Sequence, residues 1–300
     1  MQFSSRLYRD YTDLEQMRRF LIRARTRLGH LSGYFHVGDL LWRMFSNGWF
    51  QPKQDIRLWF DNTDSLVGFA WYYSRFQALD MQVFPRNLAL EQEMLAWAES
   101  GLRAALNGNG RKQLLTSALE TDHERIALLT ELGYQRQEKF YLHYLRGLPP
   151  SMLFPQLPAG FTIREVTDED IAAKVALHRA AFEPSQMSEY IYRGLRQAPG
   201  YIPELDLVAV APDGRFASFC ICWMDPVNRI GEFEPVGTHP DFRRQGLAKA
   251  VLWAGLQRMK AFGADQTLVL TPGHNQAAQK LYESLGFRAA NREFDYLKQL

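Results

Sequence analysis

Residues Thr238 to Leu256 read THPDFRRQGLAKAVLWAGL and contain the point where a predicted strand gives way to a predicted helix. The upstream residues GEFEPVG read as a strand, in which the proline must sit where no ladder N–H is needed, at a bulge or an edge. Downstream, apolar residues recur at helical spacing from Ala248 to Phe262, and Gly263 ends the helix. Strands alternating with helices in this way predict a sheet with helices on its faces.

The turn between the strand and the helix predicts an anion site. Backbone N–H groups at a helix start have no intrahelical partner, and with the helix dipole they attract a negative group, most naturally phosphate. Gly246 lets a ligand approach the backbone, and Arg243 and Arg244 add positive charge. The glycine spacing excludes the dinucleotide fingerprint, and the ATP-loop Gly-Lys-Ser/Thr is absent. The alternative is an ordinary turn with solvated arginines.

Composition bounds the class of protein. A length of 300 residues with 46% apolar residues suits two domains of ordinary size. A net charge of +2, with no long Lys/Arg block, does not suggest a nucleic-acid partner, and no apolar run is long enough to span a membrane. The N-terminus lacks the apolar core of a signal peptide. The two cysteines, Cys220 and Cys222, share one strand face without further metal ligands, which predicts reduced thiols, no metal and a cytoplasmic location.

The chain divides near its midpoint into two similar halves. The proline-rich segment 148–160 predicts a linker between a domain at 1–147 and a second at 161–300. Each half reads strand, helices, three strands, helix, strand, helix, strand, which predicts an α/β fold with a mixed sheet. We expect turns at Asn62 to Ser65 and Pro212 to Gly214, and N-caps at Thr12 or Asp13 and at Thr167 or Asp168.

The segment VGTHPDFRRQGLAKAVL resembles the acyl-CoA-binding motif of the GNAT N-acyltransferase superfamily, Arg/Gln-x-x-Gly-x-Gly/Ala, here formed by Arg243, Gly246 and Ala248. Downstream, LVLTPGHNQAAQKLYESLGFR resembles the family's next strand and the helix with its motif Asn and Tyr. The resemblance covers residues 162–300 and is degenerate in the first half. It implies two tandem GNAT-like domains, each a mixed, mostly antiparallel sheet flanked by helices, with the second domain catalytic.

The resemblance also implies roles for individual residues. Three strand residues would pair their backbone with the pantetheine arm of acetyl-CoA: Val236, Gly237 and Thr238. The amides of six residues would cradle the pyrophosphate beside Arg243: Arg244, Gln245, Gly246, Leu247, Ala248 and Lys249. Asn275 matches a residue near the pantetheine and thiol, or is simply a helix N-cap. Tyr282 matches the general acid, or packs in the core on a helical stripe.

Acyl transfer to an amine needs a neutral nucleophile, which a nearby carboxylate can produce. Glu234 and Glu232 lie on the strand that enters the acyl-CoA site, and we favour Glu234 as the base because it is closer to the reacting centre. The alternative is a charged edge strand. A tyrosine with a pKa near ~10 can protonate the departing thiolate. The backbone N–H of Val236 can stabilise the oxyanion.

The first half lacks these features. Alignment of the two halves places Leu129 opposite Tyr282 and Asp122 opposite Asn275, and no Arg-x-x-Gly-x-Gly/Ala survives. We therefore expect a non-catalytic domain that supports the sheet or walls the substrate pocket. For two segments the sequence allows two roles each. The aromatic-rich stretch 30–50 packs across the domain interface or binds a ligand. In the second half, four residues line an acceptor pocket or form core: Phe182, Met187, Tyr190 and Tyr192.

The sequence thus predicts an acetyltransferase that moves an acetyl group from acetyl-CoA to a primary amine of a small molecule or peptide by direct attack. The expected partners are acetyl-CoA and the amine acceptor, with no metal, nucleic acid or membrane, in a monomer or homodimer. The alternative is a non-catalytic protein that binds acyl-CoA and serves regulation.

Overall fold

A computed structural model describes residues 3–29, 33–46, 48, 50–105, 112–149 and 157–300. Its elements follow the predicted order in both halves. The first half contains β1 (Ser4–Leu7), α1 (Tyr11–Leu28), α2 (Val37–Phe45), α3 (Pro52–Asp55), β2 (Ile56–Phe60), β3 (Leu66–Tyr73), β4 (Ala78–Val83), α4 (Leu88–Ala105), β5 (Gln113–Leu119), α5 (His123–Glu131) and β6 (Gln135–Gly147). The second half contains β7 (Thr162–Glu165), α6 (Ile171–Ala181), α7 (Glu189–Arg196), β8 (Asp206–Val210), β9 (Phe216–Asp225), β10 (Ile230–Thr238), α8 (Leu247–Ala261), β11 (Gln266–Pro272), α9 (Gln276–Ser284) and β12 (Arg288–Gln299), with short 3-10 turns η1 (Asp168–Asp170), η2 (Pro203–Leu205) and η3 (Pro240–Phe242).

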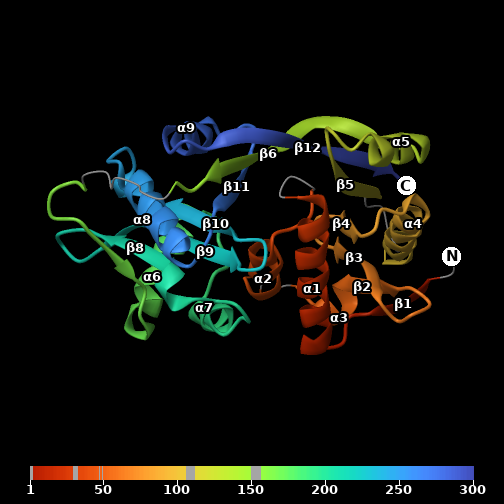
Figure 1. Cartoon of the computed structure of the whole chain (residues 1–300), viewed down its shortest axis with the longest axis horizontal. Helices are drawn as coiled ribbons and strands as arrows, with labels where there is room; N and C mark the ends of the chain where they lie inside the picture. The colour runs from red at the N-terminus through yellow and green to blue at the C-terminus, as the bar shows by residue number, and fades with distance from the viewer. Residues whose placement is uncertain (1–2, 30–32, 47, 49, 106–111, 150–156) are drawn as a thin grey trace.

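The described strands form one twelve-stranded sheet, in the order β1-β2-β3-β4-β5-β12-β6-β11-β10-β9-β8-β7. Within it, β4 pairs with β5 and β10 with β11 in parallel, and the other described pairs are antiparallel. This confirms the mixed, mostly antiparallel sheet. Figure 1 shows β6 and β12 side by side, bridging the two halves.

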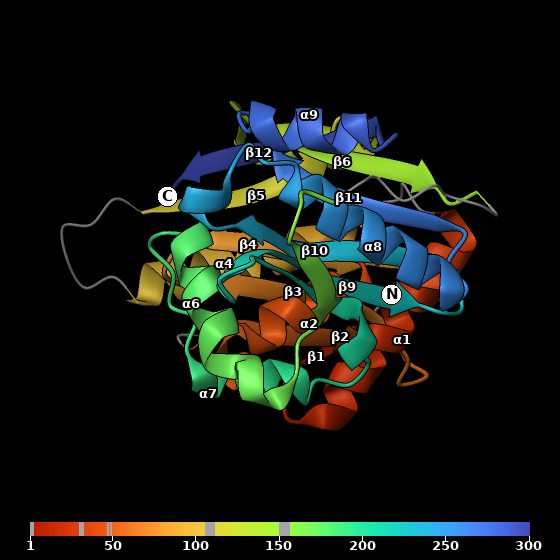
Figure 2. The ribbon, with the colours of Figure 1, turned by 90° about the vertical axis from the view of Figure 1, so that its left-hand side faces the viewer.

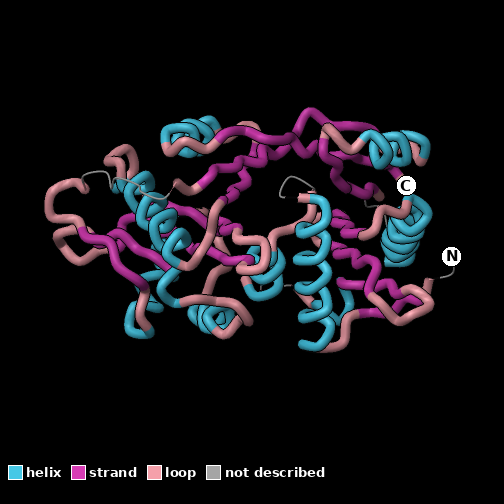
Figure 3. The backbone as a smooth tube through the Cα atoms, in the orientation of Figure 1, coloured by secondary structure: helices cyan, strands magenta, loops and turns pink. Residues whose placement is uncertain are grey.

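The last strand of each half lies among the strands of the other. β12 pairs with β5 of the first half, and β6 pairs with β11 of the second. The same two strands pair with each other, so the sheet runs without a break between the halves, as the strand band of Figure 3 shows. Of the predicted linker 148–160, residues 150–156 lie outside the described part of the chain. The division of the chain into domains at 1–147 and 161–300 stays a prediction.

Helices cover both faces of the sheet. α1, α2, α6 and α7 contribute to one core cluster that joins both halves through β2, β3, β8 and β9. α8 and α9 cover the opposite face of the second half, and α4 and α5 that of the first. Figure 2 shows α8 lying in front of the strands of the second half, with α6 and α7 below. Strand β9 is buried on both faces, so it reads as an almost continuous apolar run.

Local predictions were mostly confirmed. The two hairpin turns lie where expected, and Thr167 caps η1 through a capping box with Asp170. The prediction for α1 was wrong, because Asp10 is its N-cap and accepts a hydrogen bond from the Thr12 amide. Asp13 instead binds the Arg6 guanidinium through both carboxylate oxygens.

Candidate active site

Strands β10 and β11 of the second half separate beyond their paired segment, and the gap between their backbones is called the β10–β11 cleft below. Their parallel pairing ends at Glu232 and Leu268, and β11 then pairs with β6 alone among the described strands. The β9–β10 register shifts between Phe233 and Val236, which confirms the predicted irregularity at the intervening proline. Backbone groups of β10 beyond this bulge therefore have no strand partner toward β11 within the described chain, and an extended ligand can pair with them.

The start of α8 provides exposed backbone amides beside this cleft. Gly246 and Arg244 both have left-handed backbone conformations, with φ of 79° and 66°. Successive amides in such a turn form a concave anion site. A Cβ built at Gly246 would meet no atom within 4 Å, so the ligand side is open. Arg244 and Lys249 form no ion pair with another described residue, which leaves their charge available for phosphate. These residues fit the diphosphate of an acyl-CoA.

Other residues of the predicted cofactor site pack in the core or form hydrogen bonds within the turn. A Cβ at Gly237 would lie 2.5 Å from the Phe219 ring, so this glycine is required for packing. The side chain of Leu247 is buried, so only its backbone amide can contact a ligand. Arg243 and Gln245 contact backbone carbonyls within the same turn, those of Thr238 and Asp241.

Asn275 is the N-cap of α9, where its side-chain oxygen accepts a hydrogen bond of 3.1 Å from the Ala278 amide. Asp122 occupies the equivalent place in the first half and accepts from the Arg125 amide. This confirms both the cap and the alignment of the two halves. A contact between Asn275 and the pantetheine arm stays a prediction.

Tyr282 is buried against the rings of Tyr144 and Phe287, each with a centroid separation of 5.9 Å. Burial raises the pKa of its hydroxyl, and the negative charge of Glu234 raises it further. The phenol therefore stays protonated at neutral pH and lies within electrostatic reach of Glu234. It forms no hydrogen bond to another described residue, so its proton is available.

The two candidate bases have different surroundings. Glu234 is half-buried, and burial together with the negative charge of Asp39 raises its pKa well above the ordinary value. Glu232 is only 2% exposed, and its carboxyl contacts His36 of the first half at 3.0 Å. Glu232 is thus buried with its carboxyl against His36, whereas Glu234 is partly accessible; which of them is the base stays a prediction.

The first half supplies charged groups to the same region. Helix α2 packs against β9, β10 and α7 of the second half, so the interface role of the 30–50 stretch is confirmed for its described part. From α2, Arg43 binds Asp39 at 3.2 Å and Asp80 of β4 at 2.8 Å. Burial raises the pKa of Asp80 to about 6, although Arg43 opposes this. Sequence reasoning assigned no role to Asp39, Arg43 or Asp80. The spacing of Asp39 and Arg43, an acid and a base four residues apart on an apolar helix, was the available signal.

A model of the acetyltransferase (GNAT) family matches residues 172–287. The mycothiol acetyltransferase of Streptomyces avermitilis is 31% identical over 249 residues, which cover 78% of this chain and 76% of that protein. The chain belongs to the GNAT acetyltransferase family. The mycothiol acetyltransferase of Kineococcus radiotolerans is 37% identical over 147 residues, and that of Saccharomonospora viridis 28% over 189 residues. These matches span 47% and 61% of the relatives' length, and 47% and 58% of this chain.

Two solved GNAT structures share the fold along nearly the whole chain. The GCN5-related N-acetyltransferase of Sphaerobacter thermophilus has a TM-score of 0.68 at 19% identity, over 99% of this chain and 95% of that one. A tandem GNAT protein from the clavulanic acid biosynthesis pathway also has a TM-score of 0.68, at 14% identity over 99% and 98%. The tandem GNAT architecture is thus confirmed.

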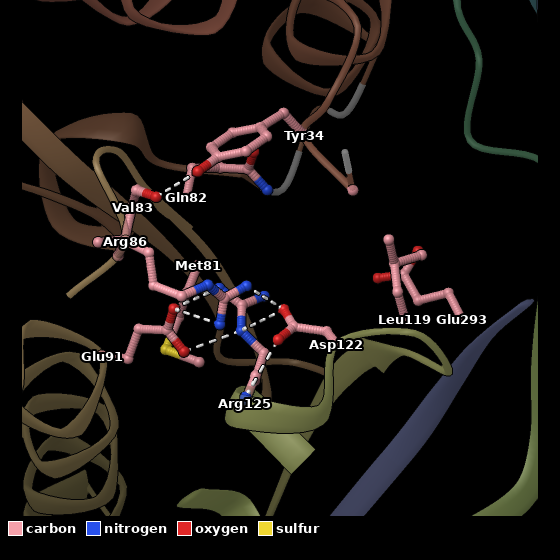
Figure 4. A pocket seen from close by; sticks show the side chains of 11 residues that line it. Tyr34, Met81, Gln82, Val83, Arg86, Glu91, Leu119, Asp122, Arg125 and Glu293 are labelled. Atoms are coloured by element: carbon pink, nitrogen blue, oxygen red, sulfur yellow. Dashed lines mark hydrogen bonds and ion pairs between the residues drawn. The ribbon is translucent and has the colours of Figure 1, made fainter. Parts of the chain in front are cut away.

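In the first GNAT-like half, side chains fill the equivalent cleft. The register of β4 and β5 has one parallel pair, Ala78 with Leu115. Beyond it, Arg86 binds Asp122 and Arg125 binds Glu91, as Figure 4 shows. These residues leave a cavity of only about 20 Å³, which they line together with Tyr34, whose hydroxyl donates to the Val83 carbonyl, and Glu293 of β12. Carboxylates neutralise both arginines. That the first half is non-catalytic stays a prediction.

The predicted acceptor-pocket residues separate into two groups. Met187 and Tyr192 are buried in the shared core, and the Tyr192 hydroxyl donates to Asp206. Phe182 and Tyr190 are exposed at 39% and 87%. The thiols of the second half are both buried, with their sulfur atoms 3.9 Å apart.

Among the described residues no helix combines the length and apolar character that crossing a membrane requires. In the same part of the chain, no three His, Cys, Asp or Glu side chains are grouped as metal ligands.

Proposed function

We propose that this GNAT acetyltransferase moves an acetyl group from acetyl-CoA to the primary amine of a small molecule or peptide. The amine nitrogen attacks the thioester carbonyl directly, and the carbon–sulfur bond breaks. The observation that carries the proposal is the position of Glu234 on β10 just beyond the last pair with β11, with the buried Tyr282 close enough for the charge of Glu234 to raise its pKa. A base and an acid at one site are what this reaction needs.

The donor would lie in that cleft. The backbone of Val236, Gly237 and Thr238 pairs with β9 on one side and has no described strand partner toward β11, which suits an extended pantetheine arm there. The open amides around Gly246 suit the diphosphate, with Arg243, Arg244 and Lys249 adding charge. Asn275 would contact the arm near the thiol. A Val236 amide directed at the acyl oxygen would stabilise the oxyanion.

Glu234 would take the proton from the amine. An alkylammonium with a pKa near ~10.4 is free amine in about one molecule in 2,500 at pH 7, a barrier of about 4.6 kcal/mol. The raised pKa of Glu234 brings the carboxylate closer to the operating pH, which makes it a better proton acceptor than an ordinary glutamate. Tyr282 would give its proton to the departing thiolate and recover one from solvent.

The acceptor would bind between the halves as a cation. Four carboxyl groups from both halves lie around Arg43: Asp39, Asp80, Glu234 and Glu293. Among the described residues they outnumber Arg43 and His143, which contacts Glu293 at 2.9 Å, so the site favours a positively charged ligand. Because the relatives matched above are named mycothiol acetyltransferases, acceptors related to mycothiol are the first to test.

The test is an amine panel followed by free-thiol release from acetyl-CoA. Tyr282→Phe should lower kcat on the correct acceptor while acetyl-CoA binding persists in calorimetry. Gly246→Asp places a carboxylate at the diphosphate site and should abolish binding. Gly133→Asp is its matched control, since Gly133 has a similar φ of 86° and equally open surroundings. Saturable binding with no thiol release for any amine would favour the regulatory acyl-CoA-binding alternative.

We also propose a cytoplasmic monomer or homodimer. Light scattering measures the mass in solution, and cell fractionation the location.

A further inference from the structure

His36 and Glu232 form a buried contact between the two halves. His36 is the N-cap of α2, and Glu232 lies on β10, with exposures of 1% and 2%. The Glu232 Oε2 atom lies 3.0 Å from His36 Nδ1. The other ring nitrogen lies 3.3 Å from the carbonyl of Ile230, and the Gly38 amide donates to Nδ1 at 3.1 Å.

These neighbours assign the hydrogens. A carbonyl oxygen only accepts, so His36 Nε2 carries the ring hydrogen. The Gly38 N–H points at Nδ1, which therefore presents its lone pair, and the imidazole is neutral. The Glu232 oxygen that faces the same lone pair must then be the donor. A carboxyl group donates only when it is protonated.

We propose that His36 holds Glu232 as a neutral carboxylic acid, and that this pair positions α2 against the strand that carries the base Glu234. The positioning role rests on the proposed function, since it concerns how Asp39 and Arg43 of α2 meet Glu234.

The surroundings favour the neutral state. Burial raises the pKa of Glu232, and the negative charge of Asp39 raises it further. Burial lowers the pKa of His36 to about 3, and the nearby Arg25 acts in the same direction. The charge of Arg25 and the Asp39 amide act in the opposite direction, toward the carboxylate, but do not outweigh burial and the charge of Asp39. A carboxylic acid can satisfy both partners, accepting from this amide and donating to His36. The charged groups that face the pair come from α1, α2, β9 and β10: Arg25, Asp39, Arg43, Asp225 and Glu234.

The pair joins the elements that carry the proposed acceptor site. On α2, Asp39 follows His36 by three residues and Arg43 by seven, about one and two helical turns away. On β10, Glu234 follows Glu232 by two residues. A change at the contact therefore moves Asp39 and Arg43 relative to Glu234. Ionisation of Glu232 would also add a negative charge near Glu234, which raises the pKa of that base.

The first experiment compares two substitutions of Glu232. In Glu232→Gln the amide N–H donates to His36 and the carbonyl accepts from Asp39, so kcat/KM should stay within about threefold of wild type with an unchanged pH profile. Glu232→Ala removes both bonds, and the acceptor KM should rise about tenfold or more while the acetyl-CoA Kd is unchanged. Glu234→Gln should abolish turnover. If Glu232→Gln is as inactive as Glu234→Gln, the proposal is overturned and Glu232 acts as a charged group.

The second experiment removes the histidine. In His36→Ala, Glu232 loses the hydrogen-bond acceptor that stabilises its neutral form, so its pKa falls, its ionised fraction rises, and the acid limb of kcat/KM should move to higher pH. The double variant His36→Ala with Glu232→Gln carries no such charge and should return the limb to its wild-type position. Identical acid limbs in wild type, single and double variants would overturn the proposal.

A third measurement does not depend on turnover. Hydrogen exchange of the α2 amides should match wild type in Glu232→Gln and speed up about tenfold or more in Glu232→Ala. Carbon NMR of the Glu232 carboxyl should show the protonated form at pH 7. If wild type acetylates no amine, the proposed function fails while these two readouts still decide the charge state and the docking of α2. Equal exchange in all three proteins, or an ionised carboxyl, would overturn the inference.

Discussion

Substituting Gly38 with alanine tests how α2 docks on the catalytic half. Gly38 lies in the first turn of α2, and a Cβ at this position would be 2.3 Å from the Cβ of Trp223 on β9. Carbon atoms in contact prefer about 3.5 Å or more, so α2 must retreat by about 1.2 Å. The contacted atom is next to the backbone of a central buried strand, so Trp223 cannot simply swing away.

The expected effect on stability follows from two opposing contributions. Overpacking a core contact costs about 1–3 kcal/mol, and this short distance indicates the upper end. Replacing glycine by alanine within a helix stabilises it by up to about 1 kcal/mol. The net loss is therefore about 2 kcal/mol, or a fall in Tm of about 3 °C for a unit of 300 residues.

The same retreat moves Asp39 and Arg43 away from Glu234. A displacement of about 1 Å near reacting groups can cost about 100-fold in rate, so the acceptor kcat/KM should fall by up to that factor. Calorimetry should show an unchanged acetyl-CoA Kd, because the α8 amides lie on the other face of the second half. Scanning calorimetry gives Tm, and thiol release gives kcat/KM.

Gly194→Ala is the matched control. Gly194 lies in α7, and a Cβ there would meet nothing within 4 Å, so this variant should be as active as wild type and slightly more stable. The docking argument is refuted if Gly38→Ala is as stable and active as Gly194→Ala.

Three further predictions concern single side chains. Lys174→Met leaves the buried Asp206 carboxylate without its cation at 2.6 Å, so urea unfolding should show a loss of about 3–5 kcal/mol; a loss below about 1 kcal/mol contradicts this. Hydrogen bonds from Arg164 hold the pKa of Asp170 below its ordinary value, so its stabilisation is present above about pH 4 and lost as the pH falls. The stability difference of Asp170→Asn, about 1 kcal/mol at pH 7 because Arg164 is partly exposed, should therefore vanish in acid rather than stay constant. Since the pKa of Asp80 is about 6, the KM for an ammonium acceptor should rise as the pH falls through 6 in wild type but not in Asp80→Asn; matching KM profiles would count against a cationic acceptor.

The sequence by itself predicted the features that depend on nearby residues. Gly246 starts α8 and Gly263 follows its end, because glycine takes the left-handed conformation at helix boundaries. Asn275 caps α9 with an oxygen three residues from its partner amide. The repeated element order and the mixed sheet follow from hydrophobic periodicity and turn residues, which short stretches of chain express.

Tertiary structure alone decided which distant segments meet. His36 and Glu232 are 196 residues apart, and nothing in either local pattern pairs them. The exchange of β6 and β12 between the halves could not be predicted either. The alternation of apolar and polar residues along a strand determines its two faces but not which strand it pairs with. Glu232 and Glu234 look equivalent in sequence, and only the packing of α2 buries the first and leaves the second half-buried beside the cleft. Burial and partner charges then set their different chemistry, since both depend on the whole fold rather than on the strand that carries them.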